Sequence, residues 1–244
     1  MTSQKKRVAV VTGAGRGIGA GIARRLARDG FHVAVVDLDE ANAQGVAGEI
    51  GGARATPFVL DVTDRQAVIA AFAEIAERCG RIDAVVNNAM WVHYAPLSDI
   101  DEPTLDRMFA IAVKGAFWTM QAALPTMIGR GGGSIVNMSS PAATRGVEGS
   151  SAYSAVKGAV SSLTWQSARE LGRYGIRVNG IIPGAVDTPG ARQVVDDEGY
   201  ELRKKLNSLG RLATPEDIAG AVSFLVSENA EYINGHLLAV DGAL

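Results

Sequence analysis

Short runs of apolar and β-branched residues alternate along the whole chain with longer segments whose apolar residues recur every three to four positions. The short runs predict strands, and the longer periodic segments predict helices. We expect seven strands, at residues 7–12, 31–37, 54–62, 81–89, 133–140, 176–184 and 236–244. Strands separated by helices pair in parallel, so the pattern predicts an α/β fold with a parallel sheet covered by helices on both faces.

The order of these elements is that of a doubly wound, parallel seven-stranded sheet, the Rossmann fold. The chain has 244 residues, 47% of them hydrophobic, and contains no linker, repeat or low-complexity tract, so we expect a single domain over residues 1–244. The least regular stretch is residues 188–211, which is rich in charge and interrupted by Gly190 and Gly199. It follows the carboxyl end of a predicted strand, so we expect a substrate lid there.

Composition narrows the classes of partner. The formal net charge is -2 and no long basic run occurs, which argues against nucleic acid and anionic membrane as partners. The basic segment at residues 1–7 leads into an apolar run too short to span a membrane, without a signal-peptide cleavage pattern, so we expect a cytoplasmic protein. The single cysteine, Cys79, excludes an intramolecular disulfide, and the three scattered histidines predict no metal site.

Tyr153 and Lys157 are four residues apart in a predicted helix, and Ser140 ends the strand before it. Residues i and i+4 share a helix face, and a nearby cation favours a phenolate, so we expect Lys157 to lower the pKa of Tyr153. A serine hydroxyl beside that phenol can hold a carbonyl or alcohol oxygen, as a hydride-transfer site requires. Taken alone, the Tyr-x-x-x-Lys spacing also describes an amphipathic helix with a snorkelling lysine.

A glycine-rich turn from Gly13 to Gly19 joins the first strand to a helix. Glycine permits positive φ and close approach, and the helix N-terminus favours negative charge, so the backbone there can bind a phosphate. The usual G-x-G-x-x-G spacing fails because Ile18 takes its last position, and the spacing that fits is Gly13, Gly17 and Gly19.

The second strand ends in Asp37, about twenty residues beyond the glycine turn. A carboxylate there accepts hydrogen bonds from ribose hydroxyls and repels a 2′-phosphate, which favours NAD over NADP. Arg16 could pair with a 2′-phosphate and so favours NADP. Asp37 occupies the place where that phosphate would lie, so we expect NAD to be preferred. Asp61 and Val62, after the third strand, contact the adenine in one interpretation; in the other they belong to a helix N-cap region with Thr63.

Nearly the whole chain resembles the short-chain dehydrogenase/reductase family. The matching motifs are Thr12-Gly13-x3-Gly17-Ile18-Gly19, Asn87-Asn88-Ala89, the set Ser140, Tyr153 and Lys157, Asn179 with Pro183-Gly184, and Val240-Asp241-Gly242. The resemblance implies an NAD-dependent oxidoreductase that interconverts a secondary alcohol and a ketone. It makes Tyr153 the general acid/base and Ser140 the residue that orients the reacting oxygen, while Lys157 holds the nicotinamide ribose and lowers the pKa of the tyrosine.

The resemblance also implies a set of cofactor-binding residues and an assembly. The cofactor residues are Gly13, Arg16, Gly17, Ile18, Gly19, Asp37, Asp61, Val62, Asn87, Ala89, Tyr153, Lys157, Pro183, Gly184, Val186 and Thr188. A homotetramer is expected, because the helical segments around 108–127 and around Tyr153 are apolar on more than one face and resemble the family's subunit interface.

Two departures from the family pattern lie near the expected site. Met90 stands where the family has glycine, and Ala112 stands where it usually has an asparagine that holds a water of the proton relay. They motivate an alternative: a non-catalytic or severely slowed dinucleotide-binding protein that acts through partner binding. The sequence does not name the substrate. Candidate pocket residues follow strands at Trp91, His93, Tyr94, 141–148 and 185–200, with His93, Glu148 and Arg192 as polar anchors.

Overall fold

All seven expected strands are present in the computed structural model, which describes residues 6–243. They form one parallel sheet in the order β3-β2-β1-β4-β5-β6-β7, so the predicted fold class is confirmed. The strands are β1 Val8–Thr12, β2 His32–Asp37, β3 Ala55–Val59, β4 Ala84–Asn87, β5 Gly133–Met138, β6 Ile176–Pro183 and β7 Leu237–Val240. Residues 1–5 of the basic N-terminal segment and Leu244 of the last predicted strand lie outside the described residues.

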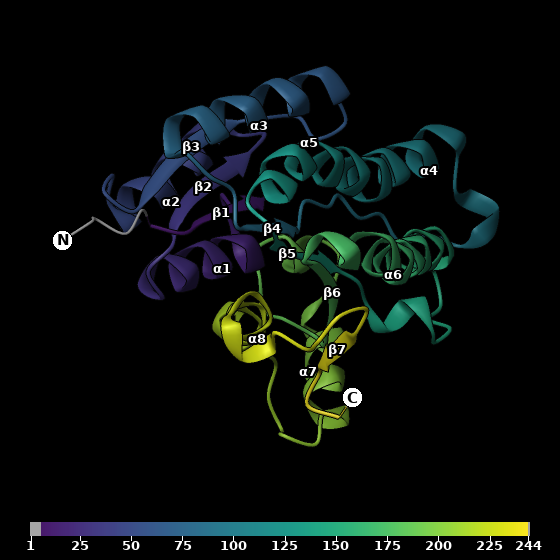
Figure 1. The fold of residues 1–244 in the computed structure, drawn as a ribbon. Helices are drawn as coiled ribbons and strands as arrows, with labels where there is room; N and C mark the ends of the chain where they lie inside the picture. The colour runs from purple at the N-terminus through teal and green to yellow at the C-terminus, as the bar shows by residue number, and fades with distance from the viewer. Residues whose placement is uncertain (1–5, 244) are drawn as a thin grey trace.

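Helices cover both faces of the sheet, as Figure 1 shows. Side chains of α1, α2 and α8 form one buried cluster on the sheet, and side chains of α3, α5 and α6 form a second on the opposite face. The helices are α1 Gly17–Arg28, α2 Glu40–Ile50, α3 Arg65–Cys79, α4 Glu102–Phe109, α5 Gly115–Gly129, α6 Ser151–Leu171, α7 Asp197–Leu206 and α8 Pro215–Val226.

Helix N-termini differ in a way that affects binding. Asp39, Asp64, Asp101 and Asp196 each accept a hydrogen bond from a backbone amide at the start of the helix that follows. Helix α1 has no such cap, because Arg16 at its N-cap position places no side-chain acceptor there. The first-turn amides of α1 therefore remain available to an anion.

The strand order creates a crevice at the carboxyl edge of the sheet. Strand β1 lies between β2 and β4, and the chain leaves β1 toward one face and β4 toward the other. Ligands of doubly wound sheets bind where the strand order reverses in this way. The glycine turn after β1 and the residues after β4 and β5 meet at this edge.

The long helical segment predicted around residues 108–127 is not one regular helix. A π-helical turn at Ala110–Lys114, labelled η2, separates α4 from α5. Such turns are uncommon and occur often at functional sites. Ala112, one of the two departures from the family pattern, is buried in this turn.

Two glycine substitutions test the close packing at the crevice. A Cβ at Gly19 would lie 2.1 Å from the Gly13 carbonyl oxygen, whereas a Cβ at Gly45 in α2 would meet nothing within 4 Å. We expect Gly19→Ala to lower the free energy of unfolding by about 1–3 kcal/mol. The Gly45→Ala control should raise it by about 0.5–1 kcal/mol, because alanine is the better helix former. Urea unfolding measures both, and a Gly19→Ala variant as stable as the wild type contradicts the packing described.

Candidate active site

The glycine turn is built by backbone contacts that exclude side chains. Gly13 and Gly17 have φ values of 62° and 54°, which favour glycine. A Cβ at Gly13 would lie 2.9 Å from the Cα of Ala89, so the turn after β1 touches the chain after β4. A Cβ at Gly17 would meet Thr188 at 3.4 Å, which places the start of the expected lid against the turn. The predicted spacing of glycines is thus explained by close approach of three chain segments.

Asn88 supports this turn, a role that the sequence analysis missed. Its side-chain amide donates to the carbonyl oxygens of Thr12 and Gly13, each at 3.0 Å. In return, the Thr12 hydroxyl accepts from the backbone amides of Asn88 and Ala89 at 3.0 and 3.1 Å. The signal was present in the paired asparagines of the sequence, but only the fold shows which of them faces the turn.

Asn87, expected in the cofactor site, uses its side chain in a buried chain of hydrogen bonds. Its oxygen accepts from the Thr119 hydroxyl at 2.6 Å, and its amide donates to Asn137 at 2.9 Å. Asn137 in turn donates to Thr164 at 3.0 Å. The chain links α5, β4, β5 and α6 behind the crevice and fixes the helix that carries Tyr153.

Asp37 lies beside the glycine turn as expected. One carboxylate oxygen accepts from the amide of Gly15 at 2.8 Å, and the other accepts from the amide of Asp39 at 3.1 Å. A negative charge is therefore fixed at the edge of the turn. Arg16, the residue that favours a 2′-phosphate, is exposed.

Asp61 and Val62 fit both interpretations of the sequence. Asp61 accepts from the amide and the hydroxyl of Thr63, both at 2.8 Å, so it organises the turn before α3. The helix cap itself is Asp64. Val62 is buried and packs against Gly115 at the start of α5. The exposed Asp61 still has its second carboxylate oxygen for a ligand.

Ser140 and Tyr153 meet at the end of β5. Ser140 is buried and caps a short 3₁₀ turn at Pro141–Ala143, where its hydroxyl accepts from the amide of Ala142 at 3.2 Å. The side chain of Ser140 acts on the phenol of Tyr153 and lowers its pKa. The ring of Tyr94 packs edge-on against Tyr153, with 5.6 Å between ring centres.

Lys157 is buried below this pair and is held by the backbone. Its ammonium donates to the carbonyl oxygen of Met138 at 2.7 Å and lies 5.7 Å from the ring centre of Tyr153. Burial lowers the pKa of Lys157 from 10.5 to about 8. Below it, the hydroxyls of Ser139 and Ser161 are 2.7 Å apart, and Ser161 donates to the Lys157 carbonyl oxygen at 2.9 Å. These bonds dock α6 on β5.

The expected lowering of the Tyr153 pKa is not found. Burial raises the pKa of the phenol well above its ordinary value, and the neighbouring Tyr94 raises it further. The side chain of Ser140 opposes the rise without reversing it. Desolvation of the buried phenolate is the largest cause of this shift, and Lys157 is not among the groups that lower the pKa of Tyr153. The phenol is therefore neutral and holds its proton.

Ala112 and Met90 lie in one apolar cluster, which also contains Val156 and Tyr153. The cluster fills the space between the π turn, the residues after β4 and helix α6. A buried amide at position 112 would need hydrogen-bond partners, which apolar neighbours do not supply. The two departures from the family pattern are thus parts of one packing arrangement.

The segment after β6 runs from the sheet to the expected lid. The backbone amide of Gly184 donates a hydrogen bond to the carbonyl oxygen of Val240 in β7 at 2.9 Å. A Cβ at Gly184 would lie 2.7 Å from the Cα of Asp241. Val186, which is buried, pairs with Ala213 in an isolated bridge. With Pro183 at the end of β6, these residues lead the chain to Thr188, which lies at the glycine turn.

Lid residues are tied together by two sets of polar contacts. Arg192 forms two hydrogen bonds of 2.7 Å with Asp187, and its guanidinium lies 5.2 Å from the ring centre of Tyr200. Just after α7, the side-chain amide of Asn207 donates a hydrogen bond to the carbonyl oxygen of Asp241 at 2.8 Å. Arg192, expected as a polar anchor for the substrate, is thus already paired.

The other candidate pocket residues divide between packing and exposure. Trp91 is covered on one side by Arg107, at 4.2 Å from its ring centre, and stacks with His93 at 6.1 Å. Glu148 is exposed. Tyr94 is the one whose ring touches Tyr153, so it is the candidate closest to the chemistry.

Comparisons with known proteins agree with this geometry. The family model described as enoyl-(acyl carrier protein) reductase matches residues 13–244. The chain is 38% identical over 247 residues to 2-(S)-hydroxypropyl-CoM dehydrogenase 3 of Xanthobacter autotrophicus, covering 98% of this chain and 97% of the relative. Other relatives are named as polyol dehydrogenases.

Solved structures give the same result. A gluconate 5-dehydrogenase from Burkholderia cenocepacia, in complex with NADP and tartrate, has a TM-score of 0.93 at 35% identity, covering 98% of this chain and 94% of that one. A 3-ketoacyl-(acyl-carrier-protein) reductase from Brucella melitensis, complexed with NADH, has a TM-score of 0.92 at 33% identity and covers 98% of both chains.

The chain belongs to the short-chain dehydrogenase/reductase family, as its motifs predicted. It is an NAD(P)-dependent oxidoreductase that interconverts alcohol and ketone groups, and nothing in the comparisons supports the non-catalytic alternative. Within residues 6–243, no helix is long and apolar enough to cross a membrane. No group of three His, Cys, Asp or Glu side chains in that range is arranged to hold a metal ion.

The buried ammonium of Lys157 predicts a pH dependence of stability. Its pKa is about 8 in the folded protein against an ordinary 10.5, so unfolding takes up a proton between these values and the folded state gains stability as pH rises through them. Lys157→Met lacks the titrating group and should be more stable than the wild type at pH 7 by about 1–3 kcal/mol. The gain should shrink toward pH 10.

Urea unfolding at pH 7 and pH 10 measures this difference, with Lys205→Met on the exposed face of α7 as the control that should show no such gain. A Lys157→Met variant less stable than the wild type at both pH values rules out a desolvation cost at this position.

Proposed function

We propose that Ser140, Tyr153 and Lys157 catalyse the interconversion of a secondary alcohol and a ketone, with a dinucleotide held on the glycine turn. The observation that carries the proposal is their convergence. The Ser140 side chain acts on the phenol of Tyr153 and lowers its pKa, and the Lys157 ammonium lies 5.7 Å from the phenol ring centre. All three stand at the carboxyl edge of the sheet, at the end of β5, where such folds bind ligands.

The residues around the turn fit a dinucleotide. The uncapped first turn of α1 offers backbone amides to a pyrophosphate, and close packing at Gly13 and Gly19 leaves no room for side chains there. Asp37 would accept hydrogen bonds from the adenosine ribose, and Val62 and Asp61 would contact the adenine. Arg16, Gly17 and Ile18 would lie at the phosphates. The nicotinamide half would be held by residues after β4, β5 and β6 and on α6: Asn87, Ala89, Tyr153, Lys157, Pro183, Gly184, Val186 and Thr188. When bound, the dinucleotide accepts or supplies the hydride.

The protein side of the reaction is proton transfer. In reduction, the hydroxyls of Ser140 and Tyr153 donate hydrogen bonds to the carbonyl oxygen of the substrate. The neutral phenol then gives its proton to the oxygen as negative charge develops there, and the Lys157 ammonium stabilises the phenolate that forms. Oxidation reverses these steps. In reduction the neutral phenol of Tyr153 begins the reaction with its proton.

We also infer two properties of the site: that NAD is preferred over NADP, and that residues 188–211 act as a substrate lid. We infer further that the chain is a single domain and that the protein is cytoplasmic. The fixed carboxylate of Asp37 supports the first inference, although the related structures contain NADP in one case and NADH in another. The contact of Thr188 with Gly17 of the glycine turn supports the second, because the segment begins beside that turn.

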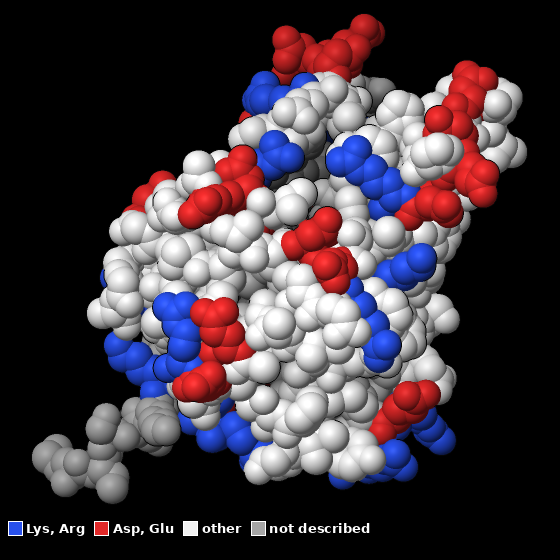
Figure 2. Space-filling view, turned by 90° about the horizontal axis from the view of Figure 1, so that it is seen from above, with Lys and Arg blue, Asp and Glu red and all other residues white. Residues whose placement is uncertain are grey.

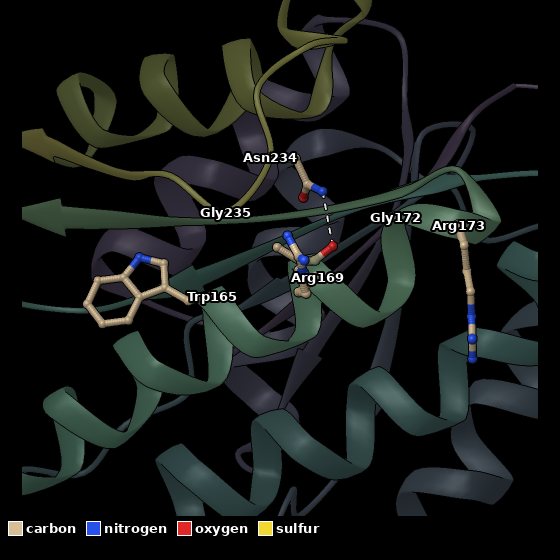
Figure 3. Close-up of a pocket in the computed structure, with 7 residues that line it drawn as sticks. Trp165, Arg169, Gly172, Arg173, Asn234 and Gly235 are labelled. Carbon is tan, nitrogen blue, oxygen red and sulfur yellow. Dashed lines mark hydrogen bonds between the residues drawn. The ribbon is translucent and has the colours of Figure 1, made fainter.

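We propose a homotetramer that uses the outer surfaces of α5 and α6. Phe117 on α5 is 43% exposed and Trp165 on α6 is 51% exposed. Large apolar side chains exposed to this extent are typical of surfaces that bind another protein chain. Figure 3 shows Trp165 on α6 at the side of a hollow of about 480 Å³, lined also by Arg169, Arg173 and Asn234. Trp165 is about 18 Å along the helix from Tyr153, so burying this surface leaves the catalytic edge open.

Tyr153→Phe tests the catalytic assignment. The change removes the transferred proton but little apolar contact, so turnover should fall about 100-fold or more while NADH binding changes little. The matched control is Tyr174→Phe, because Tyr174 packs at the far end of α6 against the second core cluster. Steady-state kinetics and NADH fluorescence titration measure the two effects. Turnover near normal in Tyr153→Phe refutes the assignment.

Asp37→Asn tests the cofactor preference. The variant keeps an acceptor oxygen for the amide of Gly15 but removes the negative charge. We expect the wild type to bind NADH about 10-fold or more tightly than NADPH, and the variant to lose most of this difference through tighter NADPH binding. Glu49→Gln on α2 is the control, since its exposed side chain pairs with Arg24 away from the turn. Equal wild-type affinities for the two cofactors would reject the preference.

Trp165→Glu tests the assembly. A charge buried at a subunit interface is costly, so the variant should form dimers or monomers where the wild type forms tetramers at micromolar concentration. Light scattering after gel filtration measures the mass, and Tyr232→Glu, at a fully exposed position outside α5 and α6, is the control. A monomeric wild type contradicts the proposed interface.

A further inference from the structure

Helix α7 of the lid has an inner and an outer face. Tyr200 and Asn207 are buried, whereas Leu202 and Leu206 are 56% and 63% exposed. Positions 200, 203 and 207 recur at helical spacing on one side of the helix. Arg203 therefore lies on the inner face, between two buried residues, and is itself half-buried.

The guanidinium of Arg203 has no acceptor within the part of the chain that the structure describes. No hydrogen bond or ion pair to it occurs among residues 6–243, while the neighbouring lid charges are paired: Arg192 with Asp187, and Lys204 with Glu201. Figure 2 shows Lys and Arg side chains bordering a recess, with acidic groups farther out on that face. A half-buried cation without a counterion is costly, so a site of this kind points to an anion from outside the chain.

The surroundings of Arg203 place that anion near the chemistry. Its positive charge acts on Tyr94, where it opposes the rise that burial causes in the pKa of the phenol. Tyr94 packs against Tyr153 with 5.6 Å between ring centres. Arg203, Tyr94 and Tyr153 thus form a line from the lid to the catalytic phenol, and Tyr200, one turn from Arg203, is held by its contact with Arg192.

We propose that Arg203 binds a carboxylate of the substrate and so selects hydroxy acids and their oxo acids over neutral polyols. The proposal rests on the proposed function, since it orients the substrate alcohol toward Tyr153. A guanidinium binds a carboxylate through two parallel hydrogen bonds, which fixes orientation as well as affinity. Tyr94 lies beside this bond and lines the space between the carboxylate and the reacting carbon.

Matched pairs of compounds test the charge alone. The pairs are lactate and propane-1,2-diol, gluconate and sorbitol, and tartrate and threitol. Within the first two pairs one carboxylate replaces one primary alcohol, and in the third pair two carboxylates replace two primary alcohols. Calorimetric titration into the NADH-bound wild type should show at least one acid bound about 10-fold or more tightly than its neutral partner. Arg203→Gln should remove the difference, and Arg203→Lys should restore part of it.

Kinetics separate this role from a structural one. In Arg203→Gln, kcat/KM for the preferred acid should fall about 10- to 100-fold, mainly through KM, while values for neutral compounds change less than about two-fold. Lys205→Gln, on the exposed side of the same helix, should match the wild type. Equal loss for acids and neutral compounds in Arg203→Gln would mean that the residue only packs the lid.

The result that overturns the proposal is a wild type that binds no acid of the three pairs better than its neutral partner. That outcome leaves the catalytic assignment standing if Tyr153→Phe still abolishes turnover of the neutral compounds. Conversely, tight acid binding that depends on Arg203, together with full activity of Tyr153→Phe, would refute the catalytic assignment and retain the anion site.

Discussion

The docking of α6 on β5 is the constraint on which the site depends. One buried ammonium, that of Lys157, reaches the Met138 carbonyl oxygen at 2.7 Å, and the Ser139 and Ser161 hydroxyls meet 2.7 Å apart one turn farther on. These bonds fix both the rotation and the height of α6 against the strand. Tyr153 is carried on the same helix, so its hydroxyl meets Ser140 only while this docking holds. The cost is a desolvated lysine, which explains its lowered pKa.

A second constraint acts from the other side of the crevice. The side chain of Asn88 holds the carbonyl oxygens of Thr12 and Gly13, and the hydroxyl of Thr12 holds the chain after β4. The glycine turn is therefore fixed by the neighbouring strand before any ligand arrives. Preorganised donors need little rearrangement on binding, which is why rigid backbone amides at a helix start serve as anion sites.

The charges of the lid divide into two groups. Arg192, in the proposed lid, is bound to Asp187, whereas Arg203 on the inner face of α7 has no partner among residues 6–243. The apolar cluster of Met90, Ala112 and Val156 lies against the catalytic tyrosine on another side. An apolar cluster therefore lies on one side of Tyr153, and the proposed anion site at Arg203 would place a cation on the lid side.

The sequence by itself determined the fold class and the family, and it predicted which residues meet at the carboxyl edge of the sheet. Alternating apolar runs and glycine spacing are local signals, set by backbone sterics and the period of each element. The tertiary structure decided which of Asn87 and Asn88 supports the turn, that Arg192 is paired, and that Arg203 is not. It also reversed the expected pKa shift of Tyr153. Those properties depend on burial and on neighbours that are distant in the chain. The spacing of residues along the sequence does not reveal which distant neighbours will remove water from a given side chain.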